Sequence, residues 1–182
     1  IIEGERALCF WLSQQTEVSL YHPDEKIKQE ALNYVSLMTP VVKSLFTDLA
    51  MEITNDAMQI HGGYGYTKDQ GIEQLYRDNR ITPIYEGTNS VQAADLVFRK
   101  LSNKNGDVIY KFLDMIKSEC DSKNEKVKTF SKELNHYLDI LSKFTDWIKD
   151  KHKIEKDDVS AAANDYLRSL GYAVSYTHLR AH

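Results

Sequence analysis

Residues 39–66 read TPVVKSLFTDLAMEITNDAMQIHGGYGY, and this stretch decides the fold class. Its apolar residues recur every three or four positions: Val41, Val42, Leu45, Phe46, Leu49, Ala50, Ile53, Ala57, Met58 and Ile60. This spacing predicts a long amphipathic helix, because residues three and four apart share one face of a helix. Thr39 and Pro40 are typical of a helix start, and Gly62 stands where a helix-ending glycine is expected.

Glycine and proline are scarce in the rest of the chain. The 182 residues include 8 glycines and 3 prolines, which is about half of the average usage. This scarcity excludes a collagen-like chain and argues against a many-turned β-sandwich. Most of the glycines lie between residues 62 and 87. We therefore predict an all-α chain with one irregular segment, the kind of place where binding and chemistry usually lie.

Similar spacing predicts further helices on both sides of the opening stretch. We expect them over residues 1–20, 25–38 (capped by Asp24), 70–79, from a cap at Thr88 or Asn89 to about Leu101, 107–120, 125–150 and 157–170. Gly171 then serves as a helix stop or as a point of close packing. Residues 1–102 carry 9 basic and 14 acidic residues, whereas residues 103–182 carry 14 and 13. This change of character places a domain boundary near residue 102.

Charge and composition exclude several classes of protein. The net charge is −4 with no evident basic face, which argues against nucleic acid as a partner. The sequence contains no run of 18 apolar residues, so it predicts no membrane span. The two cysteines, Cys9 and Cys120, make neither a disulfide framework nor a metal site, and we predict no metal. The apolar periodicity begins at the first residue, so we expect the chain to be a segment of a longer protein.

The glycines after residue 60 are a candidate ligand-binding turn. In Gln59-Ile60-His61-Gly62-Gly63-Tyr64-Gly65-Tyr66, three glycines in four positions let the backbone approach a bulky or phosphate-bearing ligand. The spacing is not the dinucleotide-binding fingerprint, and no strand precedes it. The alternative is a glycine helix stop with a tight turn. His61 either contacts a ligand or only ends the helix.

Glu86 is a candidate general base. It lies beside Tyr85 and Gly87 in an apolar loop, where loss of water raises the proton affinity of a carboxylate. The alternative is an ordinary solvated loop carboxylate. Upstream, Arg77 and Arg80 flank an aspartate. They form either a clamp for an anionic group or a local ion-pair network.

Three motifs together resemble one protein family. They are Gln-Ile-His-Gly-Gly-Tyr-Gly-Tyr (59–66), Tyr-Arg-Asp-Asn-Arg-Ile (76–81) and Ile-Tyr-Glu-Gly-Thr (84–88). Their order and distances resemble the C-terminal helical domain of flavin-dependent acyl-CoA dehydrogenases, a likeness that covers residues 1–102. Residues 103–174 look like the extra C-terminal helical domain of a longer branch, which includes methylmercaptopropionyl-CoA dehydrogenases. The resemblance implies a helical bundle of the acyl-CoA dehydrogenase type followed by a second small helical domain, truncated at both ends.

The resemblance also implies a role for Glu86 and its neighbours. Glu86 matches the family's catalytic base, which removes a proton from the α carbon of an acyl-CoA thioester. A hydride leaves the β carbon for FAD and a trans-2-enoyl-CoA forms. The backbone N–H of the glutamate helps to stabilise charge on the thioester oxygen. Tyr85 is implied to line the acyl pocket, and Gly87 to give room beside the thioester.

The cofactor contacts follow from the same resemblance. Gln59, Gly62 and Gly63 match positions that pack on the adenosine-pyrophosphate part of FAD, often from a neighbouring subunit. Thr88 and Ser90 match positions near the flavin, although Ser90 stands where the longer branch commonly has glycine. The family's other domains supply most FAD and CoA contacts. We therefore expect this chain alone to bind FAD poorly and to be inactive.

The resemblance implies an acyl-CoA substrate, an electron-transfer flavoprotein as electron acceptor, and a homodimer or homotetramer. It implies a location in the cytoplasm of a bacterium or in the mitochondrial matrix of a eukaryote. Two other functions remain open: a non-catalytic helical module for packing or oligomerisation, and an acyl-CoA oxidase. Residues 175–182 resemble a translated sequencing adaptor, and we expect them to be a non-native tail.

Overall fold

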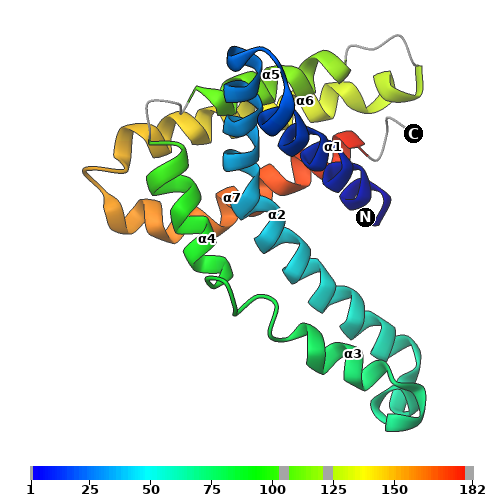
Figure 1. The fold of residues 1–182 in the computed structure, drawn as a ribbon. Helices are drawn as coiled ribbons and strands as arrows, with labels where there is room; N and C mark the ends of the chain where they lie inside the picture. Colours follow the sequence, from blue (N-terminus) through cyan, green and yellow to red (C-terminus); the bar gives the residue numbers. More distant parts are fainter. Residues whose placement is uncertain (1, 103–106, 121–124, 179–182) are drawn as a thin grey trace.

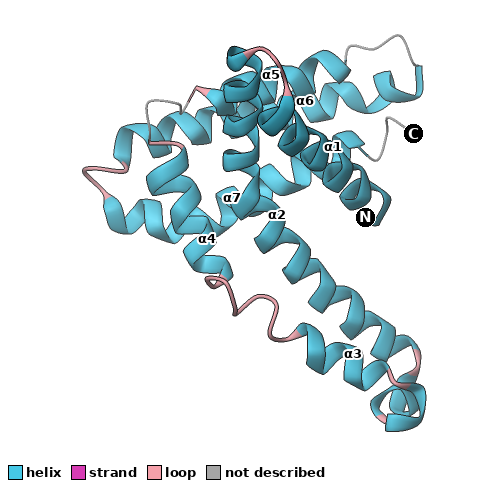
Figure 2. Ribbon diagram, viewed as in Figure 1, coloured by secondary structure: helices cyan, strands magenta, loops and turns pink. Residues whose placement is uncertain are grey.

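The computed structural model describes residues 2–102, 107–120 and 125–178, and every regular element within them is helical (Figure 2). The α-helices are α1 (Ile2–Tyr21), α2 (Glu25–Ile60), α3 (Ile72–Asn79), α4 (Asn89–Asp95), α5 (Val108–Cys120), α6 (Glu125–Lys151) and α7 (Lys156–His178). Short 3₁₀ helices, η1 (Gly62–Tyr66) and η2 (Lys68–Gln70), join α2 to α3. A π-helical turn, η3 (Leu96–Lys100), extends α4. The predicted all-α fold is confirmed.

Helix α2 is 36 residues long, and helices from both ends of the chain, α1 and α7, pack around its first half (Figure 1). It begins after Asp24, whose side chain accepts a hydrogen bond from a backbone N–H of the first turn at 2.8 Å, as predicted. The predicted second helix start at Pro40 is wrong, because α2 continues through that residue. Met38 and Val41 on either side of the proline are fully buried. Their packing outweighs the backbone hydrogen bond that Pro40 cannot donate.

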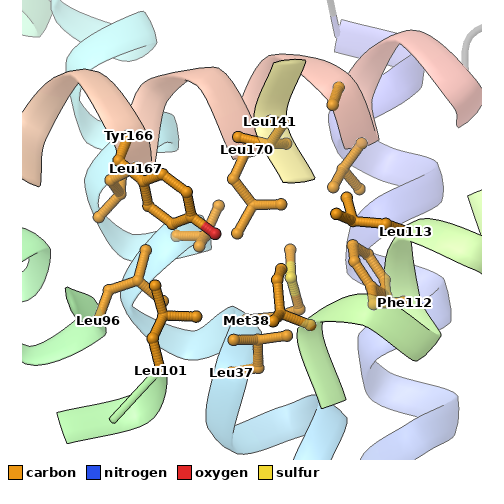
Figure 3. Packing of buried hydrophobic residues seen from close by; sticks show 14 of the residues in the cluster. Leu37, Met38, Leu96, Leu101, Phe112, Leu113, Leu141, Tyr166, Leu167 and Leu170 are labelled. Carbon is orange, nitrogen blue, oxygen red and sulfur yellow. The ribbon is translucent and has the colours of Figure 1, made fainter. Parts of the chain in front are cut away.

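One buried core joins the helices on both sides of residue 102. Leu96 and Leu101 face Tyr166 across this core, while Phe112 of α5 lies at its other end (Figure 3). Gly171 of α7 packs against α2: a Cβ atom there would lie 2.8 Å from Leu45 Cδ2. The close-packing interpretation of Gly171 is therefore right and the helix stop is wrong, since α7 runs on to His178.

Beyond Leu49, α2 leaves the bundle, and α3 packs back along it (Figure 1). We call residues 50–80 the helical arm. The structure describes all of these residues, and Gly65 is the only one of them that is buried. Large apolar side chains stay exposed there, including Ile60 at 83% and Leu75 at 59%. Several large exposed apolar side chains in one segment are typical of a region that contacts other protein.

Three expectations remain: the domain boundary near residue 102, the non-native tail and the lack of a membrane span. Residues 103–106, at the expected domain boundary, and residues 179–182, in the expected non-native tail, lie outside the described residues. Within the described ranges, no helix combines the length and the apolar character needed to cross a membrane.

Candidate functional site

The loop between α3 and α4 carries Glu86 in an unusual backbone conformation. The N–H groups of Ile84 and Tyr85 both donate to the carbonyl of Ile81, at 3.0 Å each, which closes the turn before Glu86. Glu86 then has φ +54° and Gly87 has φ +83°. Glu86 is the only non-glycine residue with positive φ in the part of the chain that the structure describes. This conformation costs a non-glycine residue about 1–2 kcal/mol, so the surroundings must hold it.

Side chains from two helices bind the carbonyl groups of this pair. Gln92 of α4 donates from Nε2 to the carbonyl of Glu86 at 3.0 Å. Lys43 of α2 donates from Nζ to the carbonyl of Gly87 at 2.8 Å. The loop is therefore fixed at two successive peptide groups, once to its own following helix and once to the axis of the bundle.

Asn89 ties the start of α4 to the same part of α2. Its Oδ1 accepts from Lys43 Nζ at 2.8 Å, and its Nδ2 donates to Asp48 Oδ1 at 2.7 Å. The N-cap of α4 is Thr88, whose Oγ1 accepts from the backbone N–H of Val91 at 3.3 Å. Of the two predicted caps, Thr88 is therefore the right one, and the Asn89 side chain links helices instead.

The side chains of the Glu86 loop that are candidates for catalysis and binding are open to solvent. The side chains of Glu86 and Ser90 are exposed, and Tyr85 is exposed at 49%. The backbone N–H groups of Glu86 and Gly87 donate to no acceptor among the described residues. The loop thus presents a carboxylate and unpaired N–H donors side by side. The dry surroundings expected for a strong carboxylate base are not built by the described residues alone.

The glycine turn lies at the tip of the helical arm (Figure 1). Gly62 has φ +59°, as its predicted role in ending the helix requires. His61 also ends the helix, since its Nδ1 lies 2.9 Å from the carbonyl oxygen of Ala57. Gln59, Gly62 and Gly63 are exposed, and a Cβ atom on either of these glycines would meet nothing within 4 Å. The turn therefore leaves room for a ligand to approach its backbone.

The structure does not bring the glycine turn and Glu86 together. Lys43 contacts the Glu86 loop and His61 adjoins the glycine turn, and both residues belong to the α2 helix or its C-terminal cap. The two residues are eighteen positions apart along this helix, which corresponds to about 27 Å. The predicted site residues thus form two groups: Tyr85 to Ser90 at the base of the arm, and Gln59 to Gly63 at its tip.

Arg77 forms a local ion pair rather than a free clamp. Its guanidinium Nε lies 2.7 Å from Glu73 Oε2, one helical turn earlier in α3. The hydrogen bond and the negative charge of Glu73 raise the pKa of Arg77. Arg77 thus takes part in a local ion pair, but its partner is Glu73 and not the neighbouring aspartate that the sequence suggested. Among the described residues, no three His, Cys, Asp or Glu side chains lie close enough together to hold a metal ion.

A pair of glycine substitutions tests the geometry of the tip. A Cβ atom at Gly65 would lie 2.7 Å from His61 Cβ and 2.9 Å from the carbonyl oxygen of Met58. Gly65→Ala should therefore weaken the turn by about 1–3 kcal/mol, seen as faster amide hydrogen exchange over residues 58–66. Gly63→Ala is the control, because nothing lies within 4 Å of that position. Equal exchange in the two variants would contradict the close contact.

Sequence reasoning missed Lys43 and Gln92 and did not assign the Asn89 amide. One signal was available for Lys43, which stands as a lone charge within the apolar run Val41, Val42, Leu45 and Phe46. A charged residue inside such a run has either a snorkelling side chain or a polar partner. Its partner, 44 residues away, can be found only from the fold.

Comparison with known proteins places these features in a family. Residues 20–101 match the family described as "Acyl-CoA dehydrogenase, C-terminal domain". A curated relative, 3-methylmercaptopropionyl-CoA dehydrogenase of Ruegeria pomeroyi, is 38% identical over 116 residues, covering 64% of this chain and 20% of that protein. Another, 3-(aryl)acrylate reductase of Clostridium sporogenes, is 58% identical over 52 residues, covering 29% of this chain and 14% of that protein.

A solved structure shares the fold over almost the whole chain. The crystal structure of Caenorhabditis elegans ACDH-11 in complex with C11-CoA matches with a TM-score of 0.81 and 22% identity, covering 97% of this chain and 30% of that one. The chain spans about a fifth of the length of the Ruegeria relative. Residues 20–101 therefore match the C-terminal helical domain of the acyl-CoA dehydrogenase family.

Proposed function

We propose that this chain is part of an FAD-dependent acyl-CoA dehydrogenase in which Glu86 removes the α proton of an acyl-CoA thioester. The Glu86 loop is the single observation that carries the proposal. It places a carboxylate and unpaired N–H groups side by side, within the Ile-Tyr-Glu-Gly-Thr motif of a domain of this family. The Ruegeria relative is named for an acyl-CoA substrate, and ACDH-11 was solved with an acyl-CoA.

The residues of the loop divide the work of the α,β-dehydrogenation. The Glu86 carboxylate takes the proton from the α carbon, while the C–H electron pair is left to form the new C=C bond. Negative charge then develops on the thioester oxygen, and the free backbone N–H of Glu86 is placed to donate to such an oxygen. Gly87 has no side chain to fill the space beside the thioester. Tyr85 lines the pocket that takes the acyl chain. FAD, when bound, supplies the acceptor for the hydride that leaves the β carbon.

The two groups of exposed residues fit two different contacts with FAD. Thr88 and Ser90 carry hydroxyls at the start of α4, next to Glu86. The open backbone at Gly62 and Gly63, with Gln59 beside it, suits the pyrophosphate and adenosine part. About 27 Å of helix separates the groups, and this distance supports a contact of the tip with the FAD of a neighbouring subunit. The proposed assembly is a homodimer or a homotetramer.

Other parts of the enzyme cover the exposed surfaces. Glu86 needs a dry pocket to act as a strong base, and the apolar side chains of the helical arm remain uncovered here. We assign both coverings to domains outside this chain. Within it, residues 1–102 and 103–174 correspond to the family's C-terminal domain and the extra domain of the longer branch. The electron acceptor is an electron-transfer flavoprotein, and the enzyme works in the bacterial cytoplasm or the mitochondrial matrix.

The test is flavin reduction in the full-length enzyme that contains this segment. The purified protein should carry FAD, and anaerobic addition of an acyl-CoA should bleach the visible flavin band. A colourless protein without FAD would instead favour a packing or oligomerisation module. Rapid peroxide formation, with no reduction of an electron-transfer flavoprotein, would identify an acyl-CoA oxidase.

A further inference from the structure

We propose that Lys43 and Asn89 are positioning residues that set the backbone of Glu86 for proton abstraction. The inference rests on the proposed function, because it concerns how the base is held rather than which reaction it serves. Neither residue reaches the carboxylate in the structure. Lys43 contacts the Gly87 carbonyl, and Asn89 contacts Lys43 and Asp48.

The conformation at Glu86 needs an external support. A glutamate with φ +54° is strained relative to the ordinary helical or extended conformations. Without support the loop would relax, and the carboxylate and its N–H group would turn together. Gln92 supports the Glu86 carbonyl from within the same segment. Lys43 is the support that connects the loop to the bundle, since it lies on α2 between the buried residues Val41 and Leu45.

The Lys43 contact is a strong one for a loop. Its ammonium group donates to Gly87 O and to Asn89 Oδ1, both at 2.8 Å, and the side chain is half-buried. Hydrogen bonds from a charged donor are shorter and about twice as strong as those between neutral groups. The Lys43 side chain therefore fixes both the end of the Glu86 loop and the first residue of α4.

Asn89 is fitted to its position by charge. Its amide oxygen faces the positive Lys43, and its NH₂ group faces the negative Asp48 Oδ1 at 2.7 Å. The two neighbours thus select one of the two amide orientations. An aspartate at this position would face Asp48 with a second negative oxygen in place of a donor. Asn89→Asp, which barely changes shape, should therefore lose the contact with Asp48 and set two negative charges against each other there, while its Oδ1 still accepts from Lys43.

The experiment uses the full-length holoenzyme with Lys43→Met and Asn89→Asp. Each should slow flavin reduction by about 10- to 100-fold, while FAD content, thermal unfolding and the Kd for acyl-CoA stay close to native. Lys43→Arg, which keeps the charge and the donors, should be faster than Lys43→Met. Lys28→Met and Asn164→Asp are the matched controls: among the described residues Lys28 pairs with Glu25 alone, and Asn164 is exposed on α7, outside the helical arm.

The outcomes separate this inference from the function on which it rests. Native rates in Lys43→Met and Asn89→Asp would overturn it, and so would losses that merely follow lost FAD or lost stability. Equal rates in Lys43→Arg and Lys43→Met would also count against a donor role. Glu86→Gln serves as the separate test of the base: if that variant keeps native flavin reduction, the proposed function itself fails. If it is inactive while the Lys43 and Asn89 variants are native, only the positioning role fails.

Discussion

Glu86→Gln in the full-length enzyme should slow flavin reduction by acyl-CoA by about 10²- to 10⁴-fold, the usual contribution of a general base. Glutamine has nearly the shape of glutamate but no oxygen basic enough to take the α proton. It also meets the same backbone cost at φ +54°, so the loop should keep its conformation. Anaerobic stopped-flow measurement of flavin absorbance gives the rate, and the absorbance before mixing gives the FAD content.

Two further variants make this result specific. Glu86→Asp keeps a carboxylate on a shorter side chain, so its rate should fall between those of the native enzyme and Glu86→Gln. Glu17→Gln is the control, because Glu17 is exposed on α1, away from the loop. Flavin reduction at the native rate in Glu86→Gln, with FAD bound, would mean that another group removes the proton.

Local signals in the sequence located the helices well, and they failed where packing decides the outcome. Asp24 and Gly62 mark the two ends of α2 because capping and positive φ are properties of a few neighbouring residues. Pro40 and Gly171 also look like helix boundaries, yet both lie inside helices. In each case a neighbouring helix packs there, and the proline and the glycine are tolerated because that packing holds the helix together.

The sequence predicts which residues belong to the candidate site, but it does not predict how they are arranged in space. The spacing of the motifs indicates Glu86 and the glycine turn, since both are linear features. The backbone conformation of Glu86 and the contact of Lys43 with Gly87 depend on how α2 and the loop meet. The separation of the two groups depends on which part of α2 the Glu86 loop meets, and this contact is set by the fold and not by a local motif.

Phe112→Ala should produce the largest loss of stability, about 3–5 kcal/mol, as expected when a large aromatic side chain leaves a packed core. Phe112 is 1% exposed. Its ring centroid lies 5.6 Å from that of Trp11 and 6.1 Å from that of Tyr34. These contacts join α5 to α1 and α2, so the cavity would open between parts of the chain on opposite sides of residue 102. Urea unfolding followed by circular dichroism measures the change in the free energy of unfolding.

The shape of that unfolding curve carries a second result. Because Phe112 belongs to the one buried core that unites the two parts, the native chain and the variant should each unfold in a single transition, shifted as a whole to lower urea. Phe10→Ala is the control: Phe10 is 71% exposed, and its loss should change stability by less than about 0.5 kcal/mol. Two separate transitions, only one of them shifted by Phe112→Ala, would show that residues 1–102 fold independently. In that case the contacts of Phe112 with Trp11 and Tyr34 would join two independently folded domains and would not be part of a single cooperative core.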